Sequence, residues 1–304
     1  MGNLYRTVLT ISVFSALLTV ISGPSPADDS SVPLKIAETD SVITGFREPL
    51  GISAGPRGGV YVADGMSGKL FKCSEGDAPL EFPVPQSLSS IYPVDVVAES
   101  APFIYVLDYF SGRVLRYDYR GAYLDVLISF EDFVPSSLTA GAGGSFILTD
   151  MENHSVLVLN PLLDREVEIE GYGWEKGFFN RPSKAVILRD GRLAVADTGN
   201  KRVQIFSSSG AYLRELPAPE SGPFRTPRSL FCGPEGNIFI ADTDRGAVFV
   251  YSAGGEFITE ISSYSGRSIS PSAVTADFNG NLFVADLLSR SVVIYRLVYP
   301  DNSP

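Results

Sequence analysis

Six aspartates recur along the chain at nearly constant spacing, and carboxylates brought together in this way could act as general acids or bases. They are Asp64, Asp108, Asp150, Asp197, Asp242 and Asp286. Each follows a proline by 15 residues, and successive aspartates are 44, 42, 47, 45 and 44 residues apart. Each also opens a short turn, where an Asp side chain accepts hydrogen bonds from backbone N–H groups two and three residues further on. Because a catalytic residue is not expected in every copy, we interpret all six as structural.

The other residue types that commonly do chemistry are scarce. His154 is the single histidine, so a zinc site built from several histidines cannot be assembled. Cys73 and Cys232 fall in non-adjacent copies of the repeat, and a disulfide needs Cα atoms within about 7 Å. We therefore expect no disulfide between them and expect both thiols to be buried. No nucleophile arrangement, Gly-rich phosphate loop or Cys-x-x-Cys pair is evident, so we expect no catalytic residue, no metal and no cofactor.

The elements that carry these residues are short strands. Within residues 182–216, apolar runs at 185–188, 193–196, 202–206 and 211–216 are separated by turns rich in Gly, Asp and Asn. β-branched and aromatic runs with such gaps predict a four-stranded antiparallel meander. A sheet that is apolar on both faces needs a neighbour on each side. Six copies with a period near 44 residues predict an all-β fold, a six-bladed β-propeller.

The ends of the chain predict how the ring closes. Residues 34–39 stand at the same offset before Pro49 as residues 211–216 stand before Pro227, where a fourth strand belongs. The last copy ends soon after its own third strand. We therefore expect the N-terminal strand to lie alongside residues 292–296 and to complete the last blade, which removes an open sheet edge. This predicts one domain over residues 33–300.

Two copies carry a recognisable motif. Val-Ala-Asp-Thr-Gly-Asn-Lys-Arg-Val at 195–203 follows Gly-Phe-Phe-Asn-Arg-Pro at 177–182, and Ile-Ala-Asp-Thr-Asp-Arg-Gly-Ala-Val at 240–248 follows Gly-Pro-Phe-Arg-Thr-Pro at 222–227. Both resemble NHL repeats, and the resemblance extends over about residues 45–297. It implies a six-bladed propeller but no single activity, because NHL-type propellers include enzymes, receptors and modules that bind RNA or protein.

In such a propeller the loops that link blades and the turns between second and third strands share one end of the ring, here called the loop face. A basic cluster falls on it although the chain as a whole is acidic, and two aromatic residues fall on the facing blade. The predicted ligand-binding residues are Arg181, Lys184, Arg225, Arg228, Arg245, Arg290, Tyr109 and Phe110. Arginine forks bind carboxylates and phosphates, and the aromatic rings offer stacking contacts. Alternatively, these cations pair with nearby acids or are solvated.

We therefore predict a non-catalytic binding module for a protein, a peptide or an anionic glycan. The alternative is a metal-assisted hydrolase or lyase at the channel, because related propeller lactonases hold calcium on Glu, Asn and Asp. The candidates are Glu48, Asp95 and Asn180. Lys184, Arg225 and Arg228 fall at equivalent levels and oppose a divalent cation. A third possibility is a structural member of an exported complex that uses the sides of the blades.

The first residues predict export. Arg6 precedes an apolar segment at 8–21 that is too short to span a bilayer comfortably, and small residues follow it. These features predict a signal peptide at 1–27 that is cleaved after Ala27, a disordered mature N-terminus at 28–32, and a secreted or periplasmic protein with no membrane span. The formal net charge is −11, which argues against nucleic acid as a partner. We expect a monomer.

Overall fold

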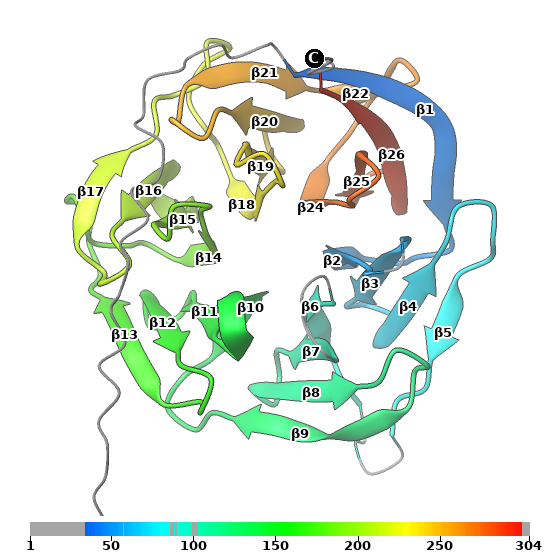
Figure 1. Ribbon diagram of the computed structural model, residues 1–304, viewed down its shortest axis with the longest axis horizontal. Helices are drawn as coiled ribbons and strands as arrows, with labels where there is room; N and C mark the ends of the chain where they lie inside the picture. The colour runs from blue at the N-terminus through cyan, green and yellow to red at the C-terminus, as the bar shows by residue number, and fades with distance from the viewer. Residues whose placement is uncertain (1–33, 57, 86–87, 89, 99–102, 300–304) are drawn as a thin grey trace, which may run out of the picture. The chain divides into compact units, whose positions relative to one another are not determined.

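A computed structural model describes residues 34–56, 58–85, 88, 90–98 and 103–299. Six four-stranded antiparallel sheets are arranged as the blades of a ring, as the repeat predicts (Figure 1). In blades 1 to 5 the strands run in chain order from the centre of the ring outward. The predicted all-β, six-bladed fold is confirmed.

The first three blades follow one another directly along the chain. Blade 1 contains β2 (Pro49–Ala54), β3 (Val60–Asp64), β4 (Lys69–Cys73) and β5 (Leu80–Phe82). Blade 2 contains β6 (Pro93–Val97), β7 (Ile104–Asp108), β8 (Arg113–Tyr117) and β9 (Tyr123–Ser129). Blade 3 contains β10 (Pro135–Ala140), β11 (Phe146–Asp150), β12 (Ser155–Leu159) and β13 (Arg165–Glu170), with a 3-10 turn η1 (Ala142–Gly144).

The remaining blades include one insertion. Blade 4 contains β14 (Pro182–Ile187), β15 (Leu193–Asp197), β16 (Arg202–Phe206) and β17 (Tyr212–Glu215), with a 3-10 turn η2 (Thr198–Asn200). Blade 5 contains β18 (Pro227–Cys232), β19 (Ile238–Asp242), β20 (Ala247–Tyr251) and β21 (Phe257–Ile261). A small hairpin, β22 (Ser263–Tyr264) and β23 (Arg267–Ser268), precedes blade 6, which contains β24 (Pro271–Ala276), β25 (Asn281–Asp286), β26 (Ser291–Val298) and β1 (Lys35–Thr44).

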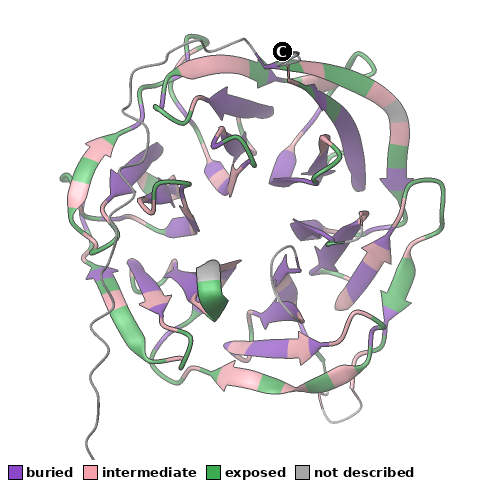
Figure 2. Cartoon of the chain, in the orientation of Figure 1, coloured by how far each residue is buried: buried purple, intermediate pink, exposed green. Residues whose placement is uncertain are grey.

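Burial falls from the centre of each blade to its outer edge (Figure 2). The second strands of blades 1 to 5 are buried at every position, as in β15, whereas fourth strands such as β17 alternate between partly buried and exposed residues. A strand buried on both faces is continuously apolar, and an outer strand that covers an edge alternates. This gradient explains why the second strand has the most uniform sequence in the repeat.

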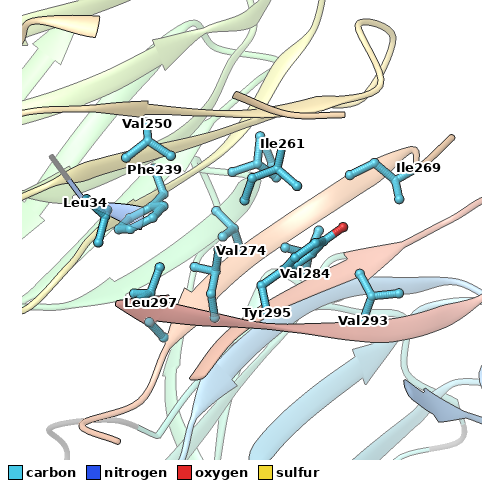
Figure 3. Packing of buried hydrophobic residues seen from close by; sticks show 14 residues of the cluster. Leu34, Phe239, Val250, Ile261, Ile269, Val274, Val284, Val293, Tyr295 and Leu297 are labelled. Atoms are coloured by element: carbon cyan, nitrogen blue, oxygen red, sulfur yellow. The ribbon is translucent and has the colours of Figure 1, made fainter. Parts of the chain in front are cut away.

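Neighbouring blades are joined by hydrophobic contacts. The described residues contain six buried clusters, and each combines residues from two adjacent blades. Figure 3 shows the cluster between blades 5 and 6, where Phe239 and Val250 of blade 5 face Val274 and Val284 of blade 6. Burial of apolar surface contributes roughly 25 cal/mol per Å², so each cluster stabilises the contact between its two blades. The hydrophobic core is thus divided among the blade interfaces.

The ring closes through its N-terminal strand. β1 pairs antiparallel with β26, from Lys35 opposite Val298 to Thr44 opposite Ser291, with an irregularity between Glu38 and Val42. The hairpin before blade 6 braces this irregularity, because the Tyr264 hydroxyl donates a hydrogen bond to the Thr39 carbonyl at 2.5 Å. The predicted closure by the N-terminal strand is confirmed.

The predicted signal peptide and the predicted disordered segment at 28–32 lie outside the described residues. Among the residues that the structure describes, no helix has the length and apolar character needed to cross a membrane.

Candidate functional site

The six repeat aspartates are buried structural residues, with exposed fractions of 3% or less. In all six copies the carboxylate accepts a hydrogen bond from the backbone N–H of at least one of the two residues before the repeat proline. The donors are Arg47 and Glu48 to Asp64, Tyr92 to Asp108, Val134 to Asp150, Asn180 to Asp197, Arg225 and Thr226 to Asp242, and Ser270 to Asp286. The bonds to N–H groups two and three residues on, which the sequence predicts for all, occur together in Asp150 and Asp286.

This geometry corrects the prediction in one respect. The aspartate joins the turn between second and third strands to the loop that enters the blade, so it fixes two segments rather than one. A buried carboxylate that is engaged in such hydrogen bonds is satisfied, which supports a structural role.

Every inner strand begins with a β-bulge. The register of each inner pair shifts between the repeat proline and the second residue after it, which leaves the residue directly after the proline out of the ladder. A bulge redirects a side chain. The six bulge residues are Leu50, Val94, Ser136, Ser183, Arg228 and Ser272, and all six line one cavity.

This cavity, called here the upper cavity, has a volume of about 280 Å³. Besides the bulge residues it is lined from three further repeat positions, namely the residue before the proline, the second residue after it, and the residue after the aspartate. These are Glu48, Tyr92, Thr226, Asp95, Ser137, Lys184, Ser229, Ala273, Tyr109, Met151 and Thr198. The fold therefore places equivalent positions of several blades around one space.

Arg228 is the only charged residue among the six bulge positions. Its side chain is partly buried, and within the described residues no hydrogen-bond acceptor or ion-pair partner contacts its guanidinium group. Burial lowers the pKa of Arg228, while the nearby charges of Glu48, Tyr92 and Asp95 act in the opposite direction. A guanidinium carries five N–H donors, so this one can still bind an anion.

Two acids near Arg228 are already engaged. Glu48 accepts a hydrogen bond of 2.7 Å from the Tyr92 hydroxyl, and burial together with this bond raises the pKa of Tyr92 to about 12. Asp95 forms an ion pair of 2.5 Å with Lys184, and the two side chains are 8% and 14% exposed. Asp95 also accepts N–H bonds from Val96 and Leu138.

The Asp95–Lys184 pair crosses the channel. The Lys184 ammonium group also donates to the Leu138 carbonyl at 2.8 Å, so the pair joins inner strands β6, β10 and β14. Asp95 and Lys184 line both the upper cavity and a lower cavity of about 100 Å³. In blade 1 the position equivalent to Asp95 is Gly51, where a Cβ atom would lie 2.5 Å from the Asp95 Cα. Only glycine fits at this close approach.

The structure brings some of the predicted ligand-binding residues together and separates others. Lys184, Arg228 and Tyr109 line the upper cavity, and the Phe110 ring lies beside it, 5.0 Å from the Tyr92 ring and 5.8 Å from that of Tyr109. The other predicted arginines do not line the cavity. Arg181 pairs with Glu152 at 3.1 Å, Arg245 donates to the Ser221 carbonyl, and Arg225 and Arg290 are exposed.

The structure also shows the contacts of the residues that the sequence offers for metal or nucleophilic chemistry. Asn180 uses its backbone N–H on Asp197, and His154 accepts the Arg181 backbone N–H through Nδ1. Within the described part of the chain, no three His, Cys, Asp or Glu side chains form a metal-ligating group. No disulfide joins Cys73 to Cys232, as predicted, but Cys232 is only partly buried. Burial raises the pKa of the buried Cys73 thiol to about 12, which suppresses its thiolate.

Sequence reasoning missed the serines and threonines of the cavity. Ser183 donates to the Arg228 carbonyl at 2.8 Å and Thr198 donates to the Pro227 carbonyl at 2.6 Å, so hydroxyls of blade 4 hold the segment that carries Arg228. An alignment of the six copies at the residue after each repeat proline could have identified the serines among them.

Comparison with known proteins agrees with this geometry. Residues 179–206 match the NHL repeat family model, and this segment contains β14, β15 and β16 of blade 4. The chain is a six-bladed β-propeller that contains an NHL repeat. The matched segment includes the repeat proline, Lys184 and Asp197, so the family match includes part of the cavity lining.

One curated relative of this chain is Protein SUPPRESSOR OF QUENCHING 1, chloroplastic, from Arabidopsis thaliana. It is 28% identical over 173 residues, which is 53% of this chain and only 14% of that protein. The chain thus spans a small part of the length of its relative.

Solved structures show the same fold at low identity. A gluconolactonase from Xanthomonas campestris gives a TM-score of 0.65 with 15% identity, covering 88% of this chain and 95% of that one. Virginiamycin B lyase from Staphylococcus aureus gives 0.58 with 14% identity, covering 87% and 100%. The WD40 propeller domain of Doa1 gives 0.59 with 12% identity, covering 88% and 98%. Enzymes and a WD40 domain share this architecture, so the fold alone selects no activity.

Proposed function

We propose that this propeller is an exported, non-catalytic binding module that accepts an anionic group of a protein, peptide or glycan in its upper cavity. The observation that carries the proposal is Arg228, a partly buried guanidinium that no acceptor contacts within the described residues. Burying a charge without a partner costs stability. A carboxylate or phosphate would supply the missing bidentate hydrogen bonds.

Both acids near Arg228 already have hydrogen-bond or ion-pair partners, which supports a binding role over a catalytic one. A general acid or base needs a free titrating oxygen, whereas Asp95 is neutralised by Lys184 and holds two backbone N–H groups. Glu48 is occupied by the Tyr92 hydroxyl. The same contacts oppose calcium at these residues, because Lys184 would have to be displaced from Asp95.

The proposal of export rests on the sequence of residues 1–27. Expression in a bacterial or yeast host followed by mass spectrometry of the exported fraction tests it. A mature chain that begins at Asp28 supports the proposal, and a protein retained in the cytosol with Met1 intact contradicts it.

The binding proposal is tested with simple anions. Titration of the purified protein with acetate, phosphate and glucuronate, followed by calorimetry, should show millimolar binding of at least one of them, weakened at least tenfold in Arg228→Met. Arg225→Met is the matched control, because Arg225 is an exposed arginine on the same blade and outside the cavity. Equal binding by the wild-type protein and Arg228→Met, or no anion binding at all, would contradict the proposal. So would a thermal stabilisation that depends on added calcium.

A further inference from the structure

The wall of the upper cavity is divided by blade. Blades 1 and 2 contribute the apolar and aromatic surface of Leu50, Val94, Tyr92 and Tyr109. They also contribute the carboxylates of Glu48 and Asp95, which are already bound to the Tyr92 hydroxyl and to Lys184. Blades 3, 4 and 5 contribute mainly hydroxyl groups and both cations, from Ser136, Ser183, Thr198, Thr226, Lys184 and Arg228. A ligand that matches both walls has an anionic group on one side and an apolar group on the other.

Exposed apolar side chains also lie on the loop face, in the turns between second and third strands. Met66, Phe110 and Leu288 each stand two residues after a repeat aspartate, in blades 1, 2 and 6, and are 61%, 77% and 67% exposed. Blades 3, 4 and 5 carry Glu152, Gly199 and Asp244 at this position. Large exposed apolar side chains that occupy equivalent turns of three consecutive blades mark an interaction site.

We infer that the ligand is a peptide segment of a partner protein in which a carboxylate residue is adjacent to a bulky apolar residue. This inference rests on the proposed anion-binding function. The carboxylate binds Arg228, which blade 5 contributes, and the apolar side chain packs against Phe110, Tyr92 and Tyr109 of blade 2. Blades 2 and 5 stand opposite each other in the six-bladed ring (Figure 1). Successive side chains of an extended peptide point in opposite directions, which matches these two walls.

The size and chemistry of the site favour a peptide over a glycan. A volume of about 280 Å³ is at the lower limit of ligand pockets, which span about 300–1,000 Å³. It therefore admits a side chain, and the remainder of the ligand lies across the loop face. Met66 and Leu288 present no flat ring on which a sugar could stack, but they bury apolar side chains well.

Calorimetry with capped tetrapeptides tests this inference. The probes are Gly-Glu-Phe-Gly, Gly-Gln-Phe-Gly and Gly-Glu-Ala-Gly, with a glucuronate trisaccharide for comparison. We expect Gly-Glu-Phe-Gly to bind at least tenfold more tightly than each of the others. Arg228→Met should abolish the preference for Glu over Gln, and Phe110→Ser should abolish the preference for Phe over Ala while preserving the preference for Glu.

Phe278→Ser is the control for Phe110→Ser, because Phe278 is 73% exposed but lies in the turn between β24 and β25, outside the loop face. Thermal unfolding of each variant shows whether it is folded. If Gly-Glu-Ala-Gly binds as tightly as Gly-Glu-Phe-Gly and still requires Arg228, the inference fails and the proposed function stands. Tighter binding of the trisaccharide also overturns the inference. If neither the peptides nor simple anions bind, the proposed function fails as well.

Discussion

Arg228 is partly buried, and a positive charge in such a position lowers the stability of the fold. The equivalent bulge positions of the other five blades hold the neutral residues Leu50, Val94 and three serines. Burial lowers the pKa of Arg228, which means that the folded environment disfavours the charged form of its guanidinium group. In the proposed function, an anionic ligand offsets this cost when it binds to Arg228.

We therefore expect Arg228→Met to stabilise the fold. Relief of an unsatisfied, partly buried charge is worth about 1 kcal/mol, the lower end of the penalty for such groups. A change of that size raises the unfolding midpoint by about 2–4 °C in a domain of 150–250 residues. Differential scanning calorimetry measures it, with Arg225→Met as an unchanged control. A midpoint that falls in Arg228→Met would show that the guanidinium supports the fold.

The Asp95–Lys184 pair supports the fold, in contrast to Arg228. Both members are nearly buried, and removal of one partner leaves an uncompensated charge in the interior, which costs about 3–5 kcal/mol. Lys184→Met should therefore lower the free energy of unfolding by about this amount, and adding Asp95→Asn should restore part of the loss. Chemical denaturation measures both variants.

The exposed pair Lys69–Glu81 provides the comparison. Its atoms lie 2.7 Å apart, as close as those of a buried pair, but the side chains are 40% and 49% exposed. Lys69→Met should cost less than about 1 kcal/mol. Equal losses in Lys69→Met and Lys184→Met would contradict the assignment of Asp95–Lys184 as an interior pair.

At the scale of the element, the inner strand and the turn that faces it form one unit. The repeat proline opens the strand, the bulge directs the next side chain into the cavity, and the aspartate fixes the loop just before the proline. The position of Arg228 therefore depends on Asp242, which accepts N–H bonds from Arg225, Thr226 and Arg245.

Asp242→Asn tests this dependence. The amide offers one acceptor oxygen instead of two, so at least one buried N–H loses its partner, at a cost of about 1–3 kcal/mol. Asp244→Asn is the control, because Asp244 is an exposed residue two positions further on, and an Asn oxygen can still accept the hydrogen bond that the Thr226 hydroxyl donates to Asp244. Its effect should stay within about 0.5 kcal/mol. Urea unfolding of both variants measures the difference. If the two variants are equally stable, the aspartate does not hold the loop.

The strands and the aspartates could be predicted from sequence because their signals are local and repeated six times. Apolar runs bounded by glycine and aspartate define each strand, and residues 34–39 could be assigned to the last blade by their offset alone. The bulges could not be predicted, because a one-residue shift in pairing leaves no mark in composition. The repeat register also predicted that Arg181, Arg225, Arg245 and Arg290 lie together with Arg228.

The structure separates them because some of these side chains bind partners on other loops. Arg181 pairs with Glu152, and Arg245 donates to the Ser221 carbonyl, and the sequence does not reveal such partners.

At the scale of the whole molecule, ring closure depends on one strand contributed by the other end of the chain. β1 covers the outer edge of β26 along seven paired positions, from Lys35 to Thr44. Its Ile36 and Ile43 pack against the clusters on the two sides of blade 6. Without β1, β26 would present an open row of backbone donors and acceptors.

Deletion of residues 35–44 should therefore produce oligomers. The exposed edge of β26 can recruit a strand from another copy of the chain, and the two adjoining clusters lose apolar side chains. Size-exclusion chromatography with light scattering should detect species larger than the monomer. A control with Lys35→Ala, which changes a single side chain near the start of β1, should elute like the wild-type protein. A deletion variant that stays monomeric and equally stable would show that β1 does not close the ring.

The ion pair that joins blades 2, 3 and 4 lies between two cavities, because Asp95 and Lys184 line both the upper and the lower one. In the proposed complex the ligand reaches Arg228 from the loop face and packs against Phe110. The lifetime of the complex should therefore depend on Phe110, and the association rate should depend on the charges of the loop face.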